Sequence, residues 1–262
     1  MFGLGEAGGA IAADLAVAGA DVRAYDPLGI PTPAGVTRAP TPDEAVSGAE
    51  FICALTAGAD AMGALAQALA AIEPSAVYAD FATAAAGLKR ELAAVAGARG
   101  IAFADIALMA AVPGNGLRTP ALASGSGAAR FAEAFVRFGM PVEACGAEAG
   151  YAATRKLLRS IVMKGLAGVV IESMRAADAA GLAGETWQNI VEQITAADET
   201  FLRRIVDGTF VHSLRRLHEM QAASDLLVEL GVPPLMTTAT VASLQAIEDG
   251  SSSAVRLPLL RQ

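Results

Sequence analysis

The sequence predicts an α/β fold with a doubly wound, mostly parallel sheet, followed by an all-α region that a long helix joins to it. Up to residue 146, short apolar runs alternate with helix-period patterns, which is typical of a parallel sheet wrapped by helices. From residue 147 onward the strand patterns stop and only helical patterns follow. We therefore expect two regions, 1–146 and 147–262.

A glycine-rich motif stands at the start of the first region, directly before an apolar helix pattern. Its spacing is G-x-G-x-x-G, and its residues are Gly3, Leu4, Gly5, Glu6, Ala7 and Gly8. Gly3 permits a tight turn from strand to helix, Gly5 lets a pyrophosphate approach the backbone, and Gly8 lets the helix pack close to the sheet. The helix N-terminus then offers free N–H groups to phosphates. We expect all six residues to contact a dinucleotide.

An acidic residue follows this motif at the distance that a dinucleotide-binding fingerprint requires. The strand pattern 20–26 ends in Asp26, about 20 residues after the glycines. Its carboxylate would accept hydrogen bonds from the adenosine ribose and repel a 2′-phosphate, which favours NAD over NADP. Arg23 and Arg38 lie near enough in sequence to keep NADP open. Together these features predict a Rossmann domain that binds NAD(P).

The fingerprint also requires a strand before Gly3, and the sequence offers only Met1 and Phe2 there. We therefore expect a truncated first strand, with neighbouring backbone groups unpaired and part of the core open. We also expect the natural start of the chain to lie several residues upstream.

Composition and charge exclude several classes of protein. No apolar run reaches the roughly 20 residues that span a bilayer, and no secretion signal begins the sequence, so we expect a cytoplasmic protein. The net charge of −8 argues against a nucleic-acid partner. Two histidines and two lone cysteines, Cys53 and Cys145, argue against a metal site and favour reduced core thiols.

The remaining elements of the first region follow from apolar runs and turn residues. Thr41 to Glu44 form a capping box with proline at the first helical position, so a short helix begins there. Thr83 is expected to cap a helix that carries Leu88 and Leu92. The expected strands are 36–38, 51–56, 76–81, 101–109, 121–124 and 142–145.

The second region is predicted to be helical throughout. A pattern of about 30 residues, 151–180, is long for a globular helix and is expected to connect the two regions. The further helices are expected at 185–206, 211–230 and 233–248, and the serine-rich tail from Gly250 is expected to be loose. Trp187 is interpreted as a core residue. Because the apolar helix faces exceed what one short domain can bury, we expect a homodimer through this region.

Two of the three lysines in the chain lie on the long helix. Lys156, Ser160 and Lys164 share one face at i, i+4 and i+8. A lysine beside a bound nicotinamide can carry the proton of a substrate hydroxyl, because partial desolvation and a positive ring favour its neutral form. Spacing alone favours the alternative, a solvated helix face.

The arrangement resembles the β-hydroxyacid dehydrogenase superfamily, which includes 3-hydroxyisobutyrate and 6-phosphogluconate dehydrogenases. The resemblance rests on 150–160, where a glycine precedes Lys156, the position of the catalytic lysine, and Ser160 stands at the position of an asparagine. It implies a Rossmann domain joined by a long helix to an all-helical domain. It also implies that Thr56 and Thr83 belong to loops beside the cofactor.

The substrate loop departs from that superfamily. Met109, Ala110 and Ala111 stand where its members have Ser-Gly-Gly, which implies a substrate other than hydroxyisobutyrate. The sequence is similar to a subgroup whose helical domain has no assigned function. That subgroup carries Lys-x-x-Arg-Ser followed by Lys-Gly, and later His-x-x-Arg-Arg-x-x-Glu-Met, here at 156–165 and 212–220.

Several basic residues are candidates for binding an anionic substrate. Guanidinium matches carboxylate or phosphate bidentately, so Arg118 and either Arg215 or Arg216 are candidates, with surface ion pairs as the alternative. Lys164 is a further candidate. His212 is a candidate that would orient the site, although a hydrogen-bonded structural histidine is the simpler interpretation.

These observations predict an NAD(P)-dependent oxidoreductase that transfers a hydride between the nicotinamide and a small, anionic hydroxy acid. Lys156 and Ser160 are the expected catalytic residues. Two alternatives remain open: an imine reductase-like enzyme of the same fold, and a non-catalytic NAD(P)-binding sensor or scaffold.

Overall fold

A computed structural model of the chain describes residues 1–252 and divides it into two compact units, Met1–Ser160 and Ile161–Gln262. The division falls inside α6 (Tyr151–Ala179) and therefore later than the expected 146/147. The reason is that the first turn of α6 is hydrogen-bonded to the sheet, through Asp105 and Ser124. The start of this helix thus belongs to the α/β unit.

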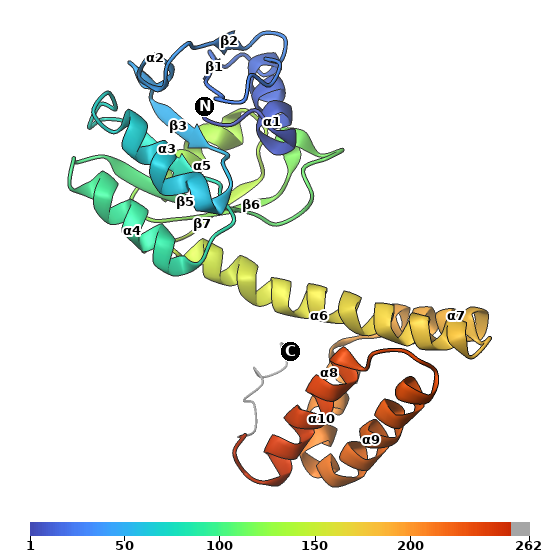
Figure 1. Cartoon of the computed structure of the whole chain (residues 1–262). Helices are drawn as coiled ribbons and strands as arrows, with labels where there is room; N and C mark the ends of the chain where they lie inside the picture. The colour runs from blue at the N-terminus through green and yellow to red at the C-terminus, as the bar shows by residue number, and fades with distance from the viewer. Residues whose placement is uncertain (253–262) are drawn as a thin grey trace. The chain divides into compact units, whose positions relative to one another are not determined.

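The first unit contains a five-stranded sheet of order β3-β4-β5-β6-β7 (Figure 1). All its neighbours are parallel except β5 and β6, which confirms the mostly parallel sheet that the sequence predicts. The strands are β3 (Phe51–Ala54), β4 (Val77–Asp80), β5 (Ala102–Leu108), β6 (Ala121–Ser124) and β7 (Val142–Gly146). A separate parallel pair consists of β1 (Arg23–Ala24) and β2 (Thr37–Arg38).

Met1 and Phe2 connect this pair to the larger sheet. Phe2 forms single parallel bridges with Tyr25 on one side and Ala54 on the other. The N–H of Phe2 donates to the Cys53 carbonyl at 2.8 Å. A cavity of about 480 Å³, lined by residues of β1, β3 and α5, opens beside Met1. The strand position before the glycine loop is thus only bridge-long, and a cavity lies beside it. The expectation of unpaired backbone groups is wrong here, because the Met1 and Phe2 carbonyls accept the N–H groups of Tyr25 and Leu55.

Helices cover both faces of the sheet, which is the doubly wound arrangement. Buried Ile11 and Phe131, from α1 and α5, share one core cluster, and buried Leu65 and Leu92, from α3 and α4, share another. The helices of this unit are α1 (Glu6–Val17), α2 (Pro42–Val46), α3 (Ala61–Ala68), α4 (Ala86–Gly97) and α5 (Ala128–Arg137). Two short 3-10 helices, η1 (Gly58–Asp60) and η2 (Gly116–Arg118), lie in the connections.

The helix caps test two local predictions. Thr41 caps α2 as predicted, because its hydroxyl accepts a hydrogen bond from the Glu44 N–H, and Pro42 is the first helical residue. The prediction that Thr83 caps α4 is wrong. The N-cap of α4 is Ala85, which has no side-chain cap, so the Thr83 hydroxyl is available for another partner.

The described part of the second unit is helical. After α6 follow α7 (Ala183–Thr195), α8 (Glu199–Val211), α9 (Ser213–Glu229) and α10 (Leu235–Glu248). The single helix expected at 185–206 is two helices, because Asp198 accepts a hydrogen bond from the Phe201 N–H and starts α8. The tail from Gly250 was expected to be loose, and beyond Ser252 it lies outside the described residues. In the part of the chain that the structure describes, no helix has the length and apolar character of a membrane span.

Both cysteines are free. Cys53 is buried on β3, and burial raises the pKa of its thiol to about 12. Cys145 is half-buried on β7, so only Cys53 lies fully in the core as predicted.

Candidate cofactor and proton-transfer site

The glycine loop makes the turn that its spacing predicts. Gly3 has a φ of +85°, and a Cβ there would lie 2.5 Å from the Leu55 carbonyl oxygen. A Cβ on Gly8 would lie 2.0 Å from the Gly3 carbonyl oxygen. Gly5, in contrast, has open space around its Cβ position, and α1 begins at the next residue, Glu6. Gly3 and Gly8 are therefore required by the turn itself. Gly5 leaves the space beside the N-terminus of α1 open for a ligand.

The surroundings of the loop fit a dinucleotide phosphate. Gly5 is the N-cap of α1 and provides no side-chain cap, so the first N–H groups of the helix keep their capacity to bind an anion. Glu6 is exposed, and Leu4 is buried beneath the turn. The Thr56 hydroxyl, just after β3, is buried and has no hydrogen-bond partner. Such an orphaned polar atom beside a glycine cradle is what a bound polar ligand would satisfy.

Asp26 lies at the expected place but is more engaged than predicted. The residue is 6% exposed. One carboxylate oxygen accepts the Leu4 N–H at 2.7 Å, and the other accepts the Leu28 N–H at 2.8 Å. Arg38 donates to the Asp26 carbonyl and to the Ile30 carbonyl, which holds the connection after β1. Asp26 therefore holds the glycine loop and the connection after β1 through its two carboxylate oxygens.

Lys156 contacts the loop that follows β4. Its Nζ donates to the Thr83 hydroxyl at 2.9 Å. Both residues line a small cavity, together with Asp105, Ile106 and Ala153. Thr83 follows the carboxyl end of β4, as Thr56 follows that of β3 and Gly3 follows Phe2. Because carboxyl ends of parallel strands share one edge of a sheet, the lysine and the glycine loop belong to the same edge.

Ser160 and Lys164 lie one and two turns after Lys156 on α6. Ser160 is half-buried and closes the first unit, whereas Lys164 is exposed and belongs to the second. The helix is continuous, so the predicted spacing on one face is present. The roles of Ser160 and Lys164 toward a substrate stay predictions.

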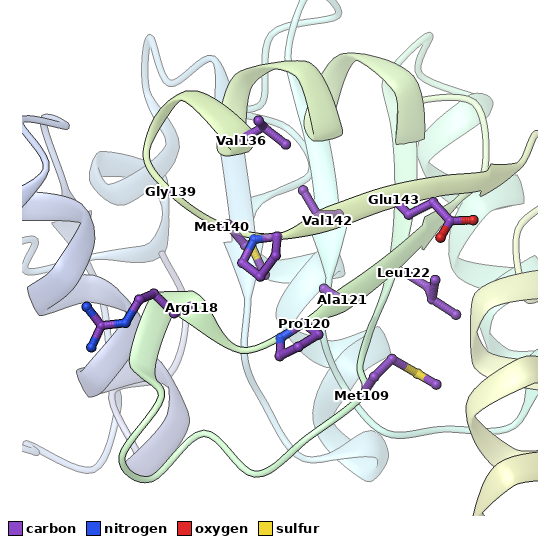
Figure 2. Close-up of a pocket in the computed structure, with 11 residues that line it drawn as sticks. Met109, Arg118, Pro120, Ala121, Leu122, Val136, Gly139, Met140, Val142 and Glu143 are labelled. Carbon is purple, nitrogen blue, oxygen red and sulfur yellow. The ribbon is translucent and has the colours of Figure 1, made fainter.

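Arg118 lies away from this pair. It is exposed at the end of η2, where the preceding Leu117 N–H donates to Asp14 on α1. It borders a broad, open cavity of about 630 Å³ that also includes Val136 and Glu143, and Figure 2 shows its guanidinium pointing away from the other lining residues. Neither Lys156 nor Thr83 lines that cavity. The structure therefore does not bring Arg118 together with the predicted catalytic lysine.

His212 and Arg216 lie in the second unit, at the junction of α8 and α9. The His212 side chain is exposed and makes no cap hydrogen bond, so the interpretation as a hydrogen-bonded structural histidine is wrong for the described residues. Arg216 donates to the Ile205 carbonyl at 3.0 Å and to the Thr209 hydroxyl. It joins two helices in this structure, in place of the surface ion pair considered above.

One cluster was missed by sequence reasoning. Lys89, Asp80 and Asp105 are all buried, and the Lys89 Nζ lies 2.6 Å from an Asp80 oxygen and 3.2 Å from an Asp105 oxygen. Burial raises the pKa of Asp80, against the opposing effect of the Lys89 charge. The available signal was the spacing of Lys89, which stands three residues before Leu92 and seven before Ala96 and so falls on the buried face of α4. Among the described residues, no group of His, Cys, Asp and Glu has the arrangement of a metal site.

The fold and the glycine cradle define a dinucleotide-binding Rossmann domain followed by a helical unit. Residues 1–130 match the NAD binding domain of 6-phosphogluconate dehydrogenase, and residues 177–247 match a domain of unknown function, DUF1932. The first unit is therefore similar to the NAD binding domain of 6-phosphogluconate dehydrogenase, and the region after the long helix is similar to DUF1932. This confirms the resemblance on which the sequence analysis rested.

The chain is also similar to individual proteins and solved structures. An uncharacterized 28.5 kDa protein of Methanothermus fervidus is 30% identical over 113 residues, which are 43% of this chain and 45% of that protein, so the match spans less than half of the relative. A reductive aminase from Aspergillus terreus, in complex with NADPH and ethyl levulinate, has a TM-score of 0.77 at 19% identity, over 95% of this chain and 93% of that one. A conserved protein described as similar to 3-hydroxyacid dehydrogenases has a TM-score of 0.60 at 24% identity, over 95% and 96%. At these identities the two structures establish the fold alone.

Proposed function

We propose that the protein is an NAD(P)-dependent oxidoreductase that transfers a hydride between the nicotinamide and the hydroxyl-bearing carbon of a small, anionic hydroxy acid. The observation that supports this most is the hydrogen bond of 2.9 Å from Lys156 Nζ to the Thr83 hydroxyl. It places an amine at the sheet edge that carries the glycine cradle. A positioned proton carrier is what alcohol oxidation requires besides a hydride acceptor.

Each side chain has a definite task in this proposal. The glycine loop and the N-terminus of α1 bind the pyrophosphate, and the Thr56 hydroxyl bonds the cofactor beside β3. The cofactor supplies or accepts the hydride when bound. In oxidation the neutral Lys156 amine removes the proton of the substrate hydroxyl, and in reduction its ammonium returns that proton. Thr83 orients the amine through its hydroxyl oxygen.

Ser160 is placed to hydrogen-bond the substrate, one turn beyond Lys156. Lys164, one turn further along α6, is the proposed ligand of its anionic group. The roles of Arg118, His212 and Arg216 toward a substrate stay predictions. A basic side chain would hold the anionic group of the substrate through its charge and its hydrogen bonds. Replacing such a side chain should therefore raise KM more than it lowers kcat.

For the cofactor we propose a preference for NAD. Asp26 follows β1 at the fingerprint position of the acid that faces the adenosine ribose, and a carboxylate there would repel a 2′-phosphate. A thermal-shift comparison of NAD, NADP and their reduced forms measures this preference. Stabilisation by NADPH alone would contradict it.

The test of the catalytic proposal is the Lys156→Arg variant. Arginine keeps the positive charge and can donate to Thr83, but its pKa above about 12 prevents it from acting as a base. We expect NAD(P)H binding to persist while turnover of a hydroxy acid panel falls about 100-fold or more. Arg90→Ala, an exposed change on α4, is the control. Full turnover in Lys156→Arg would overturn the role of the lysine.

A second candidate, imine reduction, is favoured by the substrate loop. Met109 is half-buried, and Ala110 and Ala111 are exposed, so the side chains of this segment offer a substrate carboxylate no hydrogen-bond donors. An uncharged imine has no such requirement. Assaying ketones with amines alongside hydroxy acids separates the two reactions. NAD(P)H binding without turnover in either panel would instead support a non-catalytic sensor.

A further inference from the structure

The first turn of α6 is held by a buried carboxylate. One oxygen of Asp105 accepts hydrogen bonds from the Gly150 N–H at 3.1 Å and from the Ala153 N–H at 3.0 Å. The Ser124 hydroxyl donates to the same oxygen and accepts the Ala152 N–H at 2.9 Å. The negative charge thus stands at the positive end of the helix dipole. Lys156 lies on the next turn, so its position depends on this anchor.

The second carboxylate of the cluster lies where the Thr83 loop begins. Asp80 is the last residue of β4, and the Ala82 N–H reaches one of its oxygens at 3.4 Å. Two residues separate Asp80 from Thr83, the threonine that accepts the Lys156 hydrogen bond. Asp80 and Asp105 are paired across adjacent parallel strands. Asp80 therefore stands at the start of the loop that carries Thr83, and Asp105 holds the helix turn that precedes Lys156.

Lys89 joins the two aspartates. Its ammonium donates to the Asp80 carboxylate at 2.6 Å and to the Asp80 carbonyl at 3.1 Å. The nearer oxygen of the Asp105 carboxylate lies 3.2 Å from the same nitrogen, as an ion pair. The residue is 1% exposed and each aspartate is 0% exposed. Burying three charges is costly, and buried ion pairs add little net stability, so their benefit lies elsewhere.

The backbone around Gly150 makes the same connection. Gly150 has a φ of +91°, and a Cβ there would lie 2.8 Å from the Ala86 carbonyl oxygen at the start of α4. The helix that carries Lys89 therefore contacts the residue that begins the helix carrying Lys156. The space between them has no room for a side chain at position 150.

We propose that Lys89 is a positioning residue for the Thr83–Lys156 pair. Through its hydrogen bonds to Asp80 and its ion pair with Asp105, it holds the loop that carries the Thr83 hydroxyl at a fixed position relative to the helix turn that carries the Lys156 amine. It touches neither cofactor nor substrate. The inference deepens the proposed function, because it identifies what aligns the proton carrier of the same site.

The test uses Lys89→Met, which keeps the length of the side chain and removes its charge, in the full-length protein. Hydrogen exchange of the backbone amides is measured without any substrate. We expect exchange at 81–85 and 150–156 to increase about tenfold relative to α1. Where Lys89→Met does not fold, Asp105→Asn supplies the same measurement, because the amide keeps the shape and one acceptor oxygen. Glu133→Gln, an exposed change on α5, is the control.

Turnover provides the second measurement. We expect Lys89→Met to lower kcat about tenfold with KM and the NADH dissociation constant nearly unchanged, because alignment is lost and not binding. Unchanged exchange at 81–85 and 150–156 would overturn the inference, as would a uniform rise across the whole unit. Because exchange needs no turnover, a wild type that is inactive on every panel refutes the proposed function alone. The exchange result then still decides the role of Lys89.

Discussion

The two units of the chain bury their long apolar side chains to very different extents. In the first unit, aromatic and branched side chains such as Phe103, Phe131 and Leu65 are fully buried. In the described part of the second, the buried apolar residues are Ala176, Ala177, Leu217, Leu227 and Leu244. Its exposed large apolar residues include Ile161, Val162, Ile171, Trp187, Ile194, Leu202, Val211, Leu214, Leu226, Val228 and Leu235.

This difference indicates that the first unit completes its core within one chain and the second does not. Exposed apolar surface on this scale marks an interaction site. We propose that a second copy of the chain covers the helices of the second unit, giving a homodimer. The interpretation of Trp187 as a core residue is wrong for the single chain, since 53% of it is exposed.

The largest expected effect concerns the closed core of the first unit. Phe131 is 0% exposed and contacts the rings of Phe51, Phe81 and Phe135. Phe131→Ala should lower the free energy of unfolding by about 3–5 kcal/mol, because it removes apolar area and leaves a cavity. Urea denaturation followed by circular dichroism measures this. A decrease in the free energy of unfolding below about 1 kcal/mol would contradict the claim that the first unit has a closely packed core.

The next effect concerns the open surface of the second unit. Trp187→Ala should weaken dimerisation by about 2 kcal/mol, roughly 30-fold in the dissociation constant, because tryptophans dominate such interfaces. Sedimentation across a concentration series measures the shift. Leu28→Ala is the control, since Leu28 is 83% exposed in the first unit. A wild-type protein that sediments as a monomer would contradict the proposed homodimer.

The smallest effect concerns a buried carboxylate in the second unit. Glu172 accepts hydrogen bonds from the Met236 N–H and from the Thr237 N–H and hydroxyl, at the start of α10. Burial acts to raise the pKa of Glu172, but these bonds outweigh it and lower the pKa below its usual value.

Because the folded-state pKa of Glu172 is lowered, its stabilising contribution is present above the unfolded pKa of about 4.3 and is lost as the pH falls through the folded value. Thermal unfolding of wild type and Glu172→Gln between neutral and acidic pH measures it. The two melting temperatures should differ at neutral pH and converge in acid. A constant difference across that range would contradict the role of the carboxylate.

The sequence predicted the elements whose signals are local. The glycine loop, the Thr41 cap and the strands from 51 to 146 follow from spacing, turn residues and apolar runs, and the structure has them close to the expected bounds. The resemblance also indicated Lys156 and Thr83. The contact between them, 2.9 Å from the Lys156 Nζ to the Thr83 hydroxyl, depends on the fold and could not be predicted from the sequence. The division inside α6 was missed because it depends on hydrogen bonds between residues distant in sequence.

Other errors have equally specific causes. The break between α7 and α8 was missed although Asp198 is a good N-cap residue, because the apolar pattern continues across it. The hydrogen bonds of Arg216 were not foreseen, because an arginine in a motif does not reveal that its partners are a carbonyl and a hydroxyl on the preceding helix. The Lys89 cluster was missed because burial of a lysine depends on two strands that only the fold brings together.

The central claim is that the glycine loop binds NAD(P), and Gly5→Val tests it most directly. A Cβ at Gly5 meets no protein atom within 4 Å, and its φ of −57° suits any residue, so the fold should tolerate valine. The added side chain would occupy the space of the pyrophosphate. Gly63→Ala, an equally open position on α3, is the control. Titration with NADH and NADPH, followed by nicotinamide fluorescence, should show binding to wild type and Gly63→Ala. Gly5→Val should lose that binding while it keeps its melting temperature. Equal affinity in Gly5→Val, or no binding to wild type, would contradict the account.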